Sequence, residues 1–132
     1  MKLVADTNVL VSALLNPHGS PARVLDAILA GAHTLAIDDR ILDEYREVLS
    51  RKKFKFTESD VNDLLEFIYH ESEHVAARPL ASPLSDITDQ PFLEVALEAK
   101  ADFLITGNIK DFPKGSKYLK IVTPLEFLNL AT

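Results

Sequence analysis

The sequence predicts a three-layer α/β fold, in which helices cover both faces of a five-stranded parallel sheet. Short apolar runs alternate along the chain with segments of helical periodicity, which is the order typical of a parallel sheet. The composition, 47% hydrophobic and 26% charged, is that of an ordinary folded protein. A length of 132 residues supports one hydrophobic core. We therefore expect residues 1–132 to form a single domain.

Five strands are predicted from short aliphatic or β-branched runs bounded by polar or turn-forming residues. They are Lys2–Ala5, Thr34–Ile37, His74–Ala76, Phe103–Thr106 and Tyr118–Val122. Between the first two strands, Ser20 is the expected N-cap of a crossover helix, with Pro21 in its first turn and Gly31 at its end.

Further helices follow the second and third strands. Asp38 is the expected cap of a helix from Asp39 to about Arg51, where apolar residues recur at helical spacing. Thr57 begins a third helical pattern, and Pro91 begins a fourth. The last helix is predicted by Thr123-Pro124-Leu125-Glu126, which has the spacing of a capping box.

The charge and the residue types argue against several functions. A formal net charge of −6 does not suit a protein that coats nucleic acid by bulk electrostatics, because that mode needs a basic surface. The chain has no cysteine, which excludes disulfides and thiolate metal sites. The apolar runs are too short to cross a bilayer, and the N-terminus has no signal-peptide pattern. We expect a cytoplasmic protein without a membrane span.

Two acidic residues stand where a parallel sheet forms its ligand site, beyond the carboxyl ends of the strands. Asp6 directly follows the first predicted strand, and its simpler interpretation is an N-cap for the helix that begins there. Glu44 borders an apolar stripe, three residues after Ile41 and four before Val48, so it faces partly inward. The alternative for Glu44 is a surface side chain that skirts the core.

More oxygen donors are predicted at the same edge of the sheet. Asp86 and Asp89 precede the fourth predicted helix, where both could serve as caps. Asn108 and Asp111 follow the fourth strand, where a turn is the ordinary explanation for such residues. Carboxylates drawn together repel one another, and a divalent cation such as Mg²⁺ or Mn²⁺ keeps them ionised. The whole pattern predicts metal-dependent phosphodiester chemistry.

These residues give the chain a resemblance to PIN domains. The matching motifs are Asp6-Thr7-Asn8, Glu44 in a Glu-Tyr-Arg-Glu-Val-Leu helix, and Asp86-x-x-Asp89-x-x-Phe92-Leu93-Glu94. The segment Ala101–Asn108, followed by Asp111-Phe112-Pro113, is similar to the fourth PIN motif in the branch of toxins from prokaryotic toxin-antitoxin modules. The motifs keep their order over nearly the whole chain, which makes the resemblance specific.

The resemblance implies a fold, an activity and partners. PIN domains have a five-stranded parallel sheet flanked by helices, cut single-stranded RNA with Mg²⁺ or Mn²⁺, and dimerise. Toxin members pair with a cognate antitoxin that blocks the site. We therefore expect an endoribonuclease toxin that forms a homodimer and binds an antitoxin.

The resemblance also assigns roles by position. It implies that the catalytic, metal-binding acids are Asp6, Glu44 and Asp89, with Asp86 and Asp111 as further metal ligands. Residues that hydrogen-bond to metal ligands or to a bound water are implied at Thr7, Asn8, Thr106 and Asn108.

Asn108 is where the chain departs from the family pattern. Many PIN domains have Asp at this position, and an amide cannot supply the same negative charge. The alternative function is therefore a catalytically weak or inactive PIN-fold module that binds RNA or the antitoxin.

A second motif belongs to another class of enzyme. His70-Glu71-Ser72-Glu73-His74 matches the zinc-protease pattern, in which two His one helical turn apart bind zinc and Glu is the base. The motif lies where the third helix should end and a strand should begin, so the two His are not expected to share a helix face. A polar helix end, where the dipole favours His, is the competing interpretation. A zinc metalloprotease is the distant alternative.

A short basic segment follows the helix that carries Glu44. Arg51-Lys52-Lys53-Phe54-Lys55-Phe56 interleaves cations with aromatic rings, as in strips that bind single-stranded nucleic acid. Such a run is equally compatible with ordinary surface. The candidate RNA-binding residues are Arg51, Lys52, Lys53 and Lys55.

Overall fold

The computed structural model describes residues 1–80, 89–112 and 119–131. At its centre is a parallel sheet with the strand order β3-β2-β1-β4-β5. The strands are β1 (Lys2–Ala5), β2 (Thr34–Ile37), β3 (Glu73–His74), β4 (Phe103–Ile105) and β5 (Lys120–Val122). The predicted five-stranded parallel sheet is confirmed.

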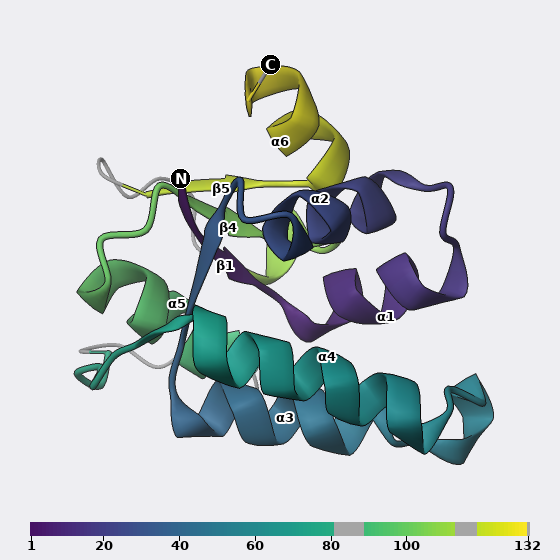
Figure 1. Ribbon diagram of the computed structural model, residues 1–132. Coiled ribbons are helices and arrows are strands. Elements are labelled where there is room, and N and C mark those ends of the chain that lie inside the picture. The colour runs from purple at the N-terminus through teal and green to yellow at the C-terminus, as the bar shows by residue number, and fades with distance from the viewer. Residues whose placement is uncertain (81–88, 113–118, 132) are drawn as a thin grey trace.

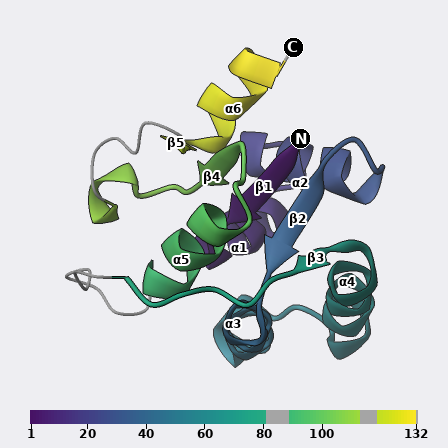
Figure 2. The same cartoon turned by 90° about the vertical axis from the view of Figure 1, so that its left-hand side faces the viewer.

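Helices cover both faces of the sheet (Figure 1 and Figure 2). On one face, α5 (Gln90–Glu98) contacts β1, β2 and β4. On the other face, α1 (Thr7–Leu15) packs against α2 (Ser20–Leu29), which also contacts α6 (Pro124–Ala131). Two further helices, α3 (Asp39–Leu49) and α4 (Glu58–Glu71), pack against each other, and α4 contacts β2. A short 3-10 turn, η1 (Lys52–Phe54), follows α3, and another, η3 (Ile109–Asp111), follows β4. The three-layer arrangement agrees with the prediction.

The central strand β1 explains where the carboxyl edge of the sheet presents its side chains. Leu3, Val4 and Ala5 are fully buried, as expected for a strand with helices on both faces. Ala5 pairs with Ile105 of β4. The residue after Ala5 therefore lies in the middle of the sheet's carboxyl edge.

Side-chain caps fix the starts of three helices, and two of these caps, at Asp38 and at Thr123 with Glu126, agree with the prediction. Asp38 Oδ1 accepts a 3.0 Å hydrogen bond from Ile41 N at the start of α3. Thr57 Oγ1 accepts one of 3.2 Å from a backbone amide three residues along, at the start of α4. Thr123 and Glu126 form the predicted capping box, with reciprocal bonds of 2.9 and 3.2 Å. Within the described residues, no helix is long and apolar enough to cross a membrane.

The third strand differs from its predicted span of His74–Ala76. It is Glu73–His74, which pairs with Ala36 and Ile37 of β2. Val75 N still donates to Ile37 O at 3.0 Å, but β2 ends there and the chain turns into α3. The predicted strand was therefore wrong at both ends, because its length is set by the strand it pairs with.

Several other boundaries also shift. The crossover helix has Gly19, not Ser20, as its N-cap, because Gly19 O accepts the first helical hydrogen bond from Arg23 N at 3.2 Å. Gly31 lies just beyond its end, with a φ of +85°. The helix predicted to reach Arg51 ends at Leu49. Three more boundaries shift by one or two residues: β4 ends at Ile105, α5 begins at Gln90 and β5 begins at Lys120. Tyr118, the predicted first residue of β5, lies outside the described residues.

Candidate active site

Asp6 is a buried carboxylate at the carboxyl end of β1. Its backbone N–H donates to Ile105 O of β4 at 2.9 Å, which continues the pairing of the two strands. Its side chain is turned toward the β4 side, where Oδ2 accepts hydrogen bonds from Thr106 Oγ1 at 2.8 Å and Asn8 Nδ2 at 3.2 Å. The residue is 6% exposed and occupies the N-cap position of α1. Backbone N–H groups of Thr7 and Asn8, in the first turn of α1, also act on the carboxylate and lower its pKa, so Asp6 combines a position at the helix start with bonds to the β4 side.

The sheet topology explains why a ligand site would form here. The chain leaves β1 toward β2 on one side, whereas β4 and β5 lie on the other side. Connections that diverge from neighbouring strands leave a crevice at the carboxyl edge, and ligands of open α/β sheets bind in such crevices. Asp6 follows β1 and Thr106 follows β4, so both border this position.

Glu44 approaches the same place from α3. Ile41 and Tyr45 are fully buried and fix the rotation of the helix, which leaves Glu44 half-buried at the border of the apolar stripe. The carboxylate accepts a hydrogen bond from Oγ1 of Thr7, the buried residue next to Asp6. The structure therefore brings together the first two acids of the predicted site.

Tyr45, the residue after Glu44, links α3 to the end of β1. Its hydroxyl donates to Ala5 O at 2.6 Å, and its ring packs against Phe92 of α5 at 6.2 Å. Burial raises the pKa of the phenol, and the charges of Asp6 and Glu44 raise it further. The hydroxyl therefore stays protonated and remains a donor.

Removal of this hydroxyl gives a first testable prediction. Tyr45→Phe leaves the ring in place but deprives Ala5 O of a buried donor, so we expect a loss of about 1–2 kcal/mol in the free energy of unfolding. Urea denaturation of the two proteins measures it. Tyr69→Phe, at a half-exposed ring on α4, is the matched control, and an equal effect of both substitutions would contradict the role of the buried bond.

The surroundings of Asp6 disfavour its charged form. Burial raises the pKa of the carboxyl group, hydrogen bonds from the Thr106 side chain and from backbone N–H groups of Thr7 and Asn8 lower it, and the negative charge of Asp111 raises it; the net shift is upward. A divalent cation would relieve both the desolvation and the repulsion. The electrostatics of Asp6 are therefore those of a carboxylate suited to hold a cation.

The loop after β4 is tied to Asp6 by a chain of hydrogen bonds. Thr106 is fully buried, and its Oγ1 donates to Asp6 while accepting from Asn108 N at 3.0 Å. Gly107 N donates to Asn8 Oδ1 at 3.3 Å. Asn108 and Asp111 are both exposed, but Asp111 is the residue whose charge acts on Asp6.

Asp89 lies at the start of α5, the helix that covers β1 on one face of the sheet. It is 8% exposed. Its side chain makes no capping bond to α5, a helix that the structure describes in full. Its predicted neighbour Asp86 lies outside the described residues.

Oxygen donors of this kind suit Mg²⁺ or Mn²⁺. Mg²⁺ prefers hard oxygen ligands, keeps several waters and is commonly held by only one or two carboxylates. Asp6 and Glu44 supply two, and the amide and hydroxyl groups of Asn8, Thr7 and Thr106 surround them. Across residues 1–80, 89–112 and 119–131, no group of three His, Cys, Asp or Glu is arranged to hold an ion. The two carboxylates and the neighbouring oxygens therefore fit a cation that keeps several of its waters.

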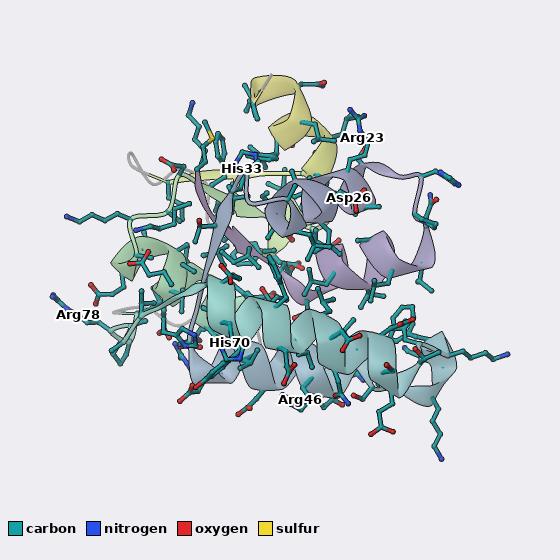
Figure 3. The ribbon with its side chains drawn as sticks, viewed as in Figure 1. Arg23, Asp26, His33, Arg46, His70 and Arg78 are labelled. Atoms are coloured by element: carbon teal, nitrogen blue, oxygen red, sulfur yellow. The ribbon has the colours of Figure 1, made fainter. Side chains whose placement is uncertain are left out.

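The residues of the zinc-protease motif do not form such a site. His70 lies in the last turn of α4, as Figure 3 shows, whereas His74 lies in β3. His74 Nε2 is 2.6 Å from Tyr69 O, and both imidazole rings contact the Tyr69 ring edge-on. The two His do not share a helix face, as expected, so the zinc metalloprotease alternative lacks its geometry.

The basic segment differs in part from a strip that binds RNA. Its four cationic side chains are exposed, as predicted. However, Phe54 and Phe56 are half-buried and stack on each other at 5.6 Å, and Arg51 pairs with Glu47 at 2.9 Å. The rings are therefore engaged with each other, and the segment offers charge to a nucleic acid more readily than stacking surfaces.

An ion pair between Glu94, which is buried, and Arg40, which is half-exposed, was not expected from the sequence. Glu94 of α5 is 4% exposed, and its Oε1 accepts from Arg40 Nη1 at 2.6 Å. Its Oε2 accepts from Leu80 N at 2.7 Å. Arg40 also binds Asp38 at 2.7 Å and lies one helical turn before Glu44. The sequence signal for this pair was the position of Glu94 among the apolar residues of α5, because a buried acid needs a partner.

Comparison with known proteins agrees with this geometry. A family model described as PIN domain matches residues 2–110, most of the chain, and the chain therefore belongs to the PIN domain family. An uncharacterised protein of Methanocaldococcus jannaschii, MJ1680, is 34% identical over 141 residues, covering 98% of this chain and 90% of that protein.

A solved structure shares the fold. It is the crystal structure of VapBC2 from Rickettsia felis bound to a DNA fragment from their promoter. The TM-score is 0.55 with 19% sequence identity, and the match covers 92% of this chain and 97% of that chain. At this identity the likeness supports the fold alone.

Proposed function

We propose that this PIN-domain chain, a single domain over residues 1–132, is an endoribonuclease that cuts single-stranded RNA with Mg²⁺ or Mn²⁺. The observation that supports it most is the placement of Asp6: a buried carboxylate at the carboxyl edge of the sheet between β1 and β4, held by Thr106 and Asn8, next to the residue that bonds Glu44. The pKa of this buried acid stays raised in spite of the hydrogen bonds that it accepts, and a cation site supplies a reason to keep such a group.

In this proposal Asp6 and Glu44 hold the cation, with Asp89 and Asp111 as further carboxylates and Asp86 as a candidate among the remaining residues. Thr106 and Asn8 orient the Asp6 carboxylate through Oδ2, and Thr7 does the same for Glu44. When bound, the cation supplies Lewis acidity that lowers the pKa of water and offsets charge on the phosphate.

The proposed partners are those of a toxin. The fourth motif resembles that of toxin-antitoxin proteins, and the Rickettsia felis protein of the same fold is a VapBC2 complex. We propose that the chain forms a homodimer, acts in the cytoplasm and is restrained by a cognate antitoxin.

A binding module without activity is the second candidate. It is favoured by Asn108, an amide at the position where the PIN motif that this chain resembles commonly has Asp. Such a module would bind RNA or an antitoxin without cutting.

Cleavage of RNA by purified protein tests the proposal. A mixed pool of single-stranded RNA is incubated with wild-type protein and Mn²⁺ or Mg²⁺, with EDTA, and with Asp6→Asn protein. We expect cleavage only in the wild-type reactions with metal, and a loss of more than about 100-fold in Asp6→Asn, because ligand loss should exceed the effect of losing a residue that only orients a ligand.

Asp63→Asn, at an exposed acid on α4, is the matched control and should retain full activity. Cleavage that persists in both EDTA and Asp6→Asn would refute the metal mechanism. RNA binding without cleavage under either metal would favour the binding module.

A further inference from the structure

A groove of about 390 Å³ opens in the loop that follows β4. Its lining residues are Gly107, Asn108, Ile109, Lys110, Asp111 and Thr123. The volume falls within the range of small-ligand sites, about 300–1,000 Å³. The groove is therefore large enough to receive one nucleotide unit.

The groove is directly joined to the Asp6 site. Gly107 N donates to Asn8 Oδ1 at 3.3 Å, and Asn8 in turn donates to Asp6. Asn108 N donates to Thr106 Oγ1 at 3.0 Å, and Thr106 donates to Asp6. Two lining residues are thus each one hydrogen-bonded residue away from the carboxylate. The backbone of Gly107 and Asn108 therefore connects the groove to the surroundings of Asp6.

The exposed side chains of the groove have the chemistry of nucleotide recognition. Lys110 is exposed and supplies a cation for a phosphate. Ile109 is 37% exposed and offers an apolar surface for a base. The carboxamide of Asn108 carries both a donor and an acceptor, the pair that matches the N6 and N7 edge of adenine.

We propose that this groove binds the nucleotide next to the scissile phosphate, and that Asn108 determines specificity by contacting its base. The inference rests on the proposed ribonuclease function. It assigns Asn108 to base recognition, whereas the position of Asn108 in the family motif implies a residue that lies beside the metal ligands. The backbone N–H of Asn108 bonds to Thr106, and the side chain is exposed.

Cleavage mapping tests the role of Asn108. Random single-stranded RNA is cut by wild-type, Asn108→Ala and Asn108→Asp proteins with Mn²⁺, and the new ends are sequenced. We expect wild-type protein to prefer adenine at one fixed position beside the cut, and both variants to lose about ten-fold of that preference. The Mn²⁺ concentration for half-maximal activity should stay the same. An unchanged base preference, or a shifted Mn²⁺ dependence with unchanged preference, would overturn the proposal.

Lys110 gives an independent measurement. Lys110→Ala should raise KM several-fold at constant kcat and lower the salt dependence of binding by about one phosphate contact. Lys120→Ala is the matched control. Lys120 is also exposed, but it lies opposite Phe103 in the β4–β5 pairing, at the end of the strands away from Asp6. Equal KM values for the two variants would count against the groove. Thermal melting of each variant confirms that its fold is intact.

A binding assay separates this inference from the proposed function. Fluorescence anisotropy in EDTA compares labelled oligo-A and oligo-U on wild-type, Asn108→Ala and Lys110→Ala proteins. If wild-type protein cuts no RNA but prefers oligo-A in an Asn108-dependent manner, the ribonuclease proposal fails and the groove stands. If it cuts RNA but neither variant changes binding, KM or cleavage pattern, the groove proposal fails alone.

Discussion

Asp6→Asn protein is expected to melt at a higher temperature than wild-type protein in EDTA, although it loses RNA cleavage. The carboxylate is 6% exposed and close to the negative charge of Asp111, and its pKa in the fold is raised. An ionised Asp6 therefore opposes folding at neutral pH, whereas a neutral amide does not. An increase of about 1 kcal/mol would raise Tm by about 4 °C in a domain of this length.

The pH dependence has a defined sign. Because the pKa of Asp6 is raised in the folded protein, its contribution to stability is fully present below its unfolded pKa of about 3.9 and is lost as the pH rises through the folded value. The difference in Tm between Asp6→Asn and wild type should thus grow from pH 4 to pH 7. Melting curves across this range, in EDTA, measure it.

Metal should reverse the order of stability. A cation that binds only the folded wild type stabilises it increasingly as its concentration exceeds Kd, whereas Asp6→Asn lacks a ligand and should gain little. Asp63→Asn should follow wild type in both conditions. If Asp6→Asn melted below wild type in EDTA, the result would contradict the prediction, because it would mean that the Asp6 carboxylate stabilises the fold without metal.

The sequence predicts β1, β2 and β4 well because each is buried and pairs on both sides, so each appears as a continuous apolar run. The third strand was placed wrongly because β3 pairs only with β2. The residues after His74 lie beyond the last residue of β2, so they have no strand to pair with. Edge strands take their limits from a partner distant in sequence, and local composition does not contain that information.

The predicted site residues divide in the same way, into those that local sequence is enough to place and those that depend on distant parts of the chain. Asp6 follows a buried strand and Glu44 borders an apolar stripe, so position along the chain was enough to bring them together. The roles of Asn108 and Asp111 were not separable, because the loop conformation depends on bonds to Asn8, about a hundred residues away in sequence, and to Thr106. The pair Arg40–Glu94 is likewise a long-range contact.

Loss of the Arg40 side chain is expected to give the largest destabilisation away from the carboxylate site. Arg40 is the cation that Glu94 meets inside the fold, and a buried charge left without its cation costs about 3–5 kcal/mol. The Arg40 side chain is 48% exposed, so water screens the pair and we expect about 2–3 kcal/mol for Arg40→Met. Urea denaturation at pH 7 measures the loss.

The acid side of the pair should behave differently. Glu94→Gln removes the buried charge but keeps only one of the two acceptor oxygens, because its amide NH2 replaces the oxygen that faces either Arg40 or Leu80 N. We therefore expect a loss of about 1–2 kcal/mol, less than for Arg40→Met. The double variant should lose less than the sum of the single losses, because the thioether that replaces Arg40 then faces a neutral amide. Arg46→Met, at an exposed position on the same helix, should change stability by less than about 0.5 kcal/mol.

Acid should remove the effect of the pair. Burial tends to raise the pKa of Glu94, but the hydrogen bonds from Arg40 and Leu80 N outweigh it, so the net shift is downward. A lowered pKa gives stability that is present above the unfolded value of about 4.3 and is lost as the pH falls through the folded value. The gap between wild type and Arg40→Met should therefore narrow in acid. A gap that is constant from pH 7 to pH 3 would mean that Arg40 acts through packing and not through its charge.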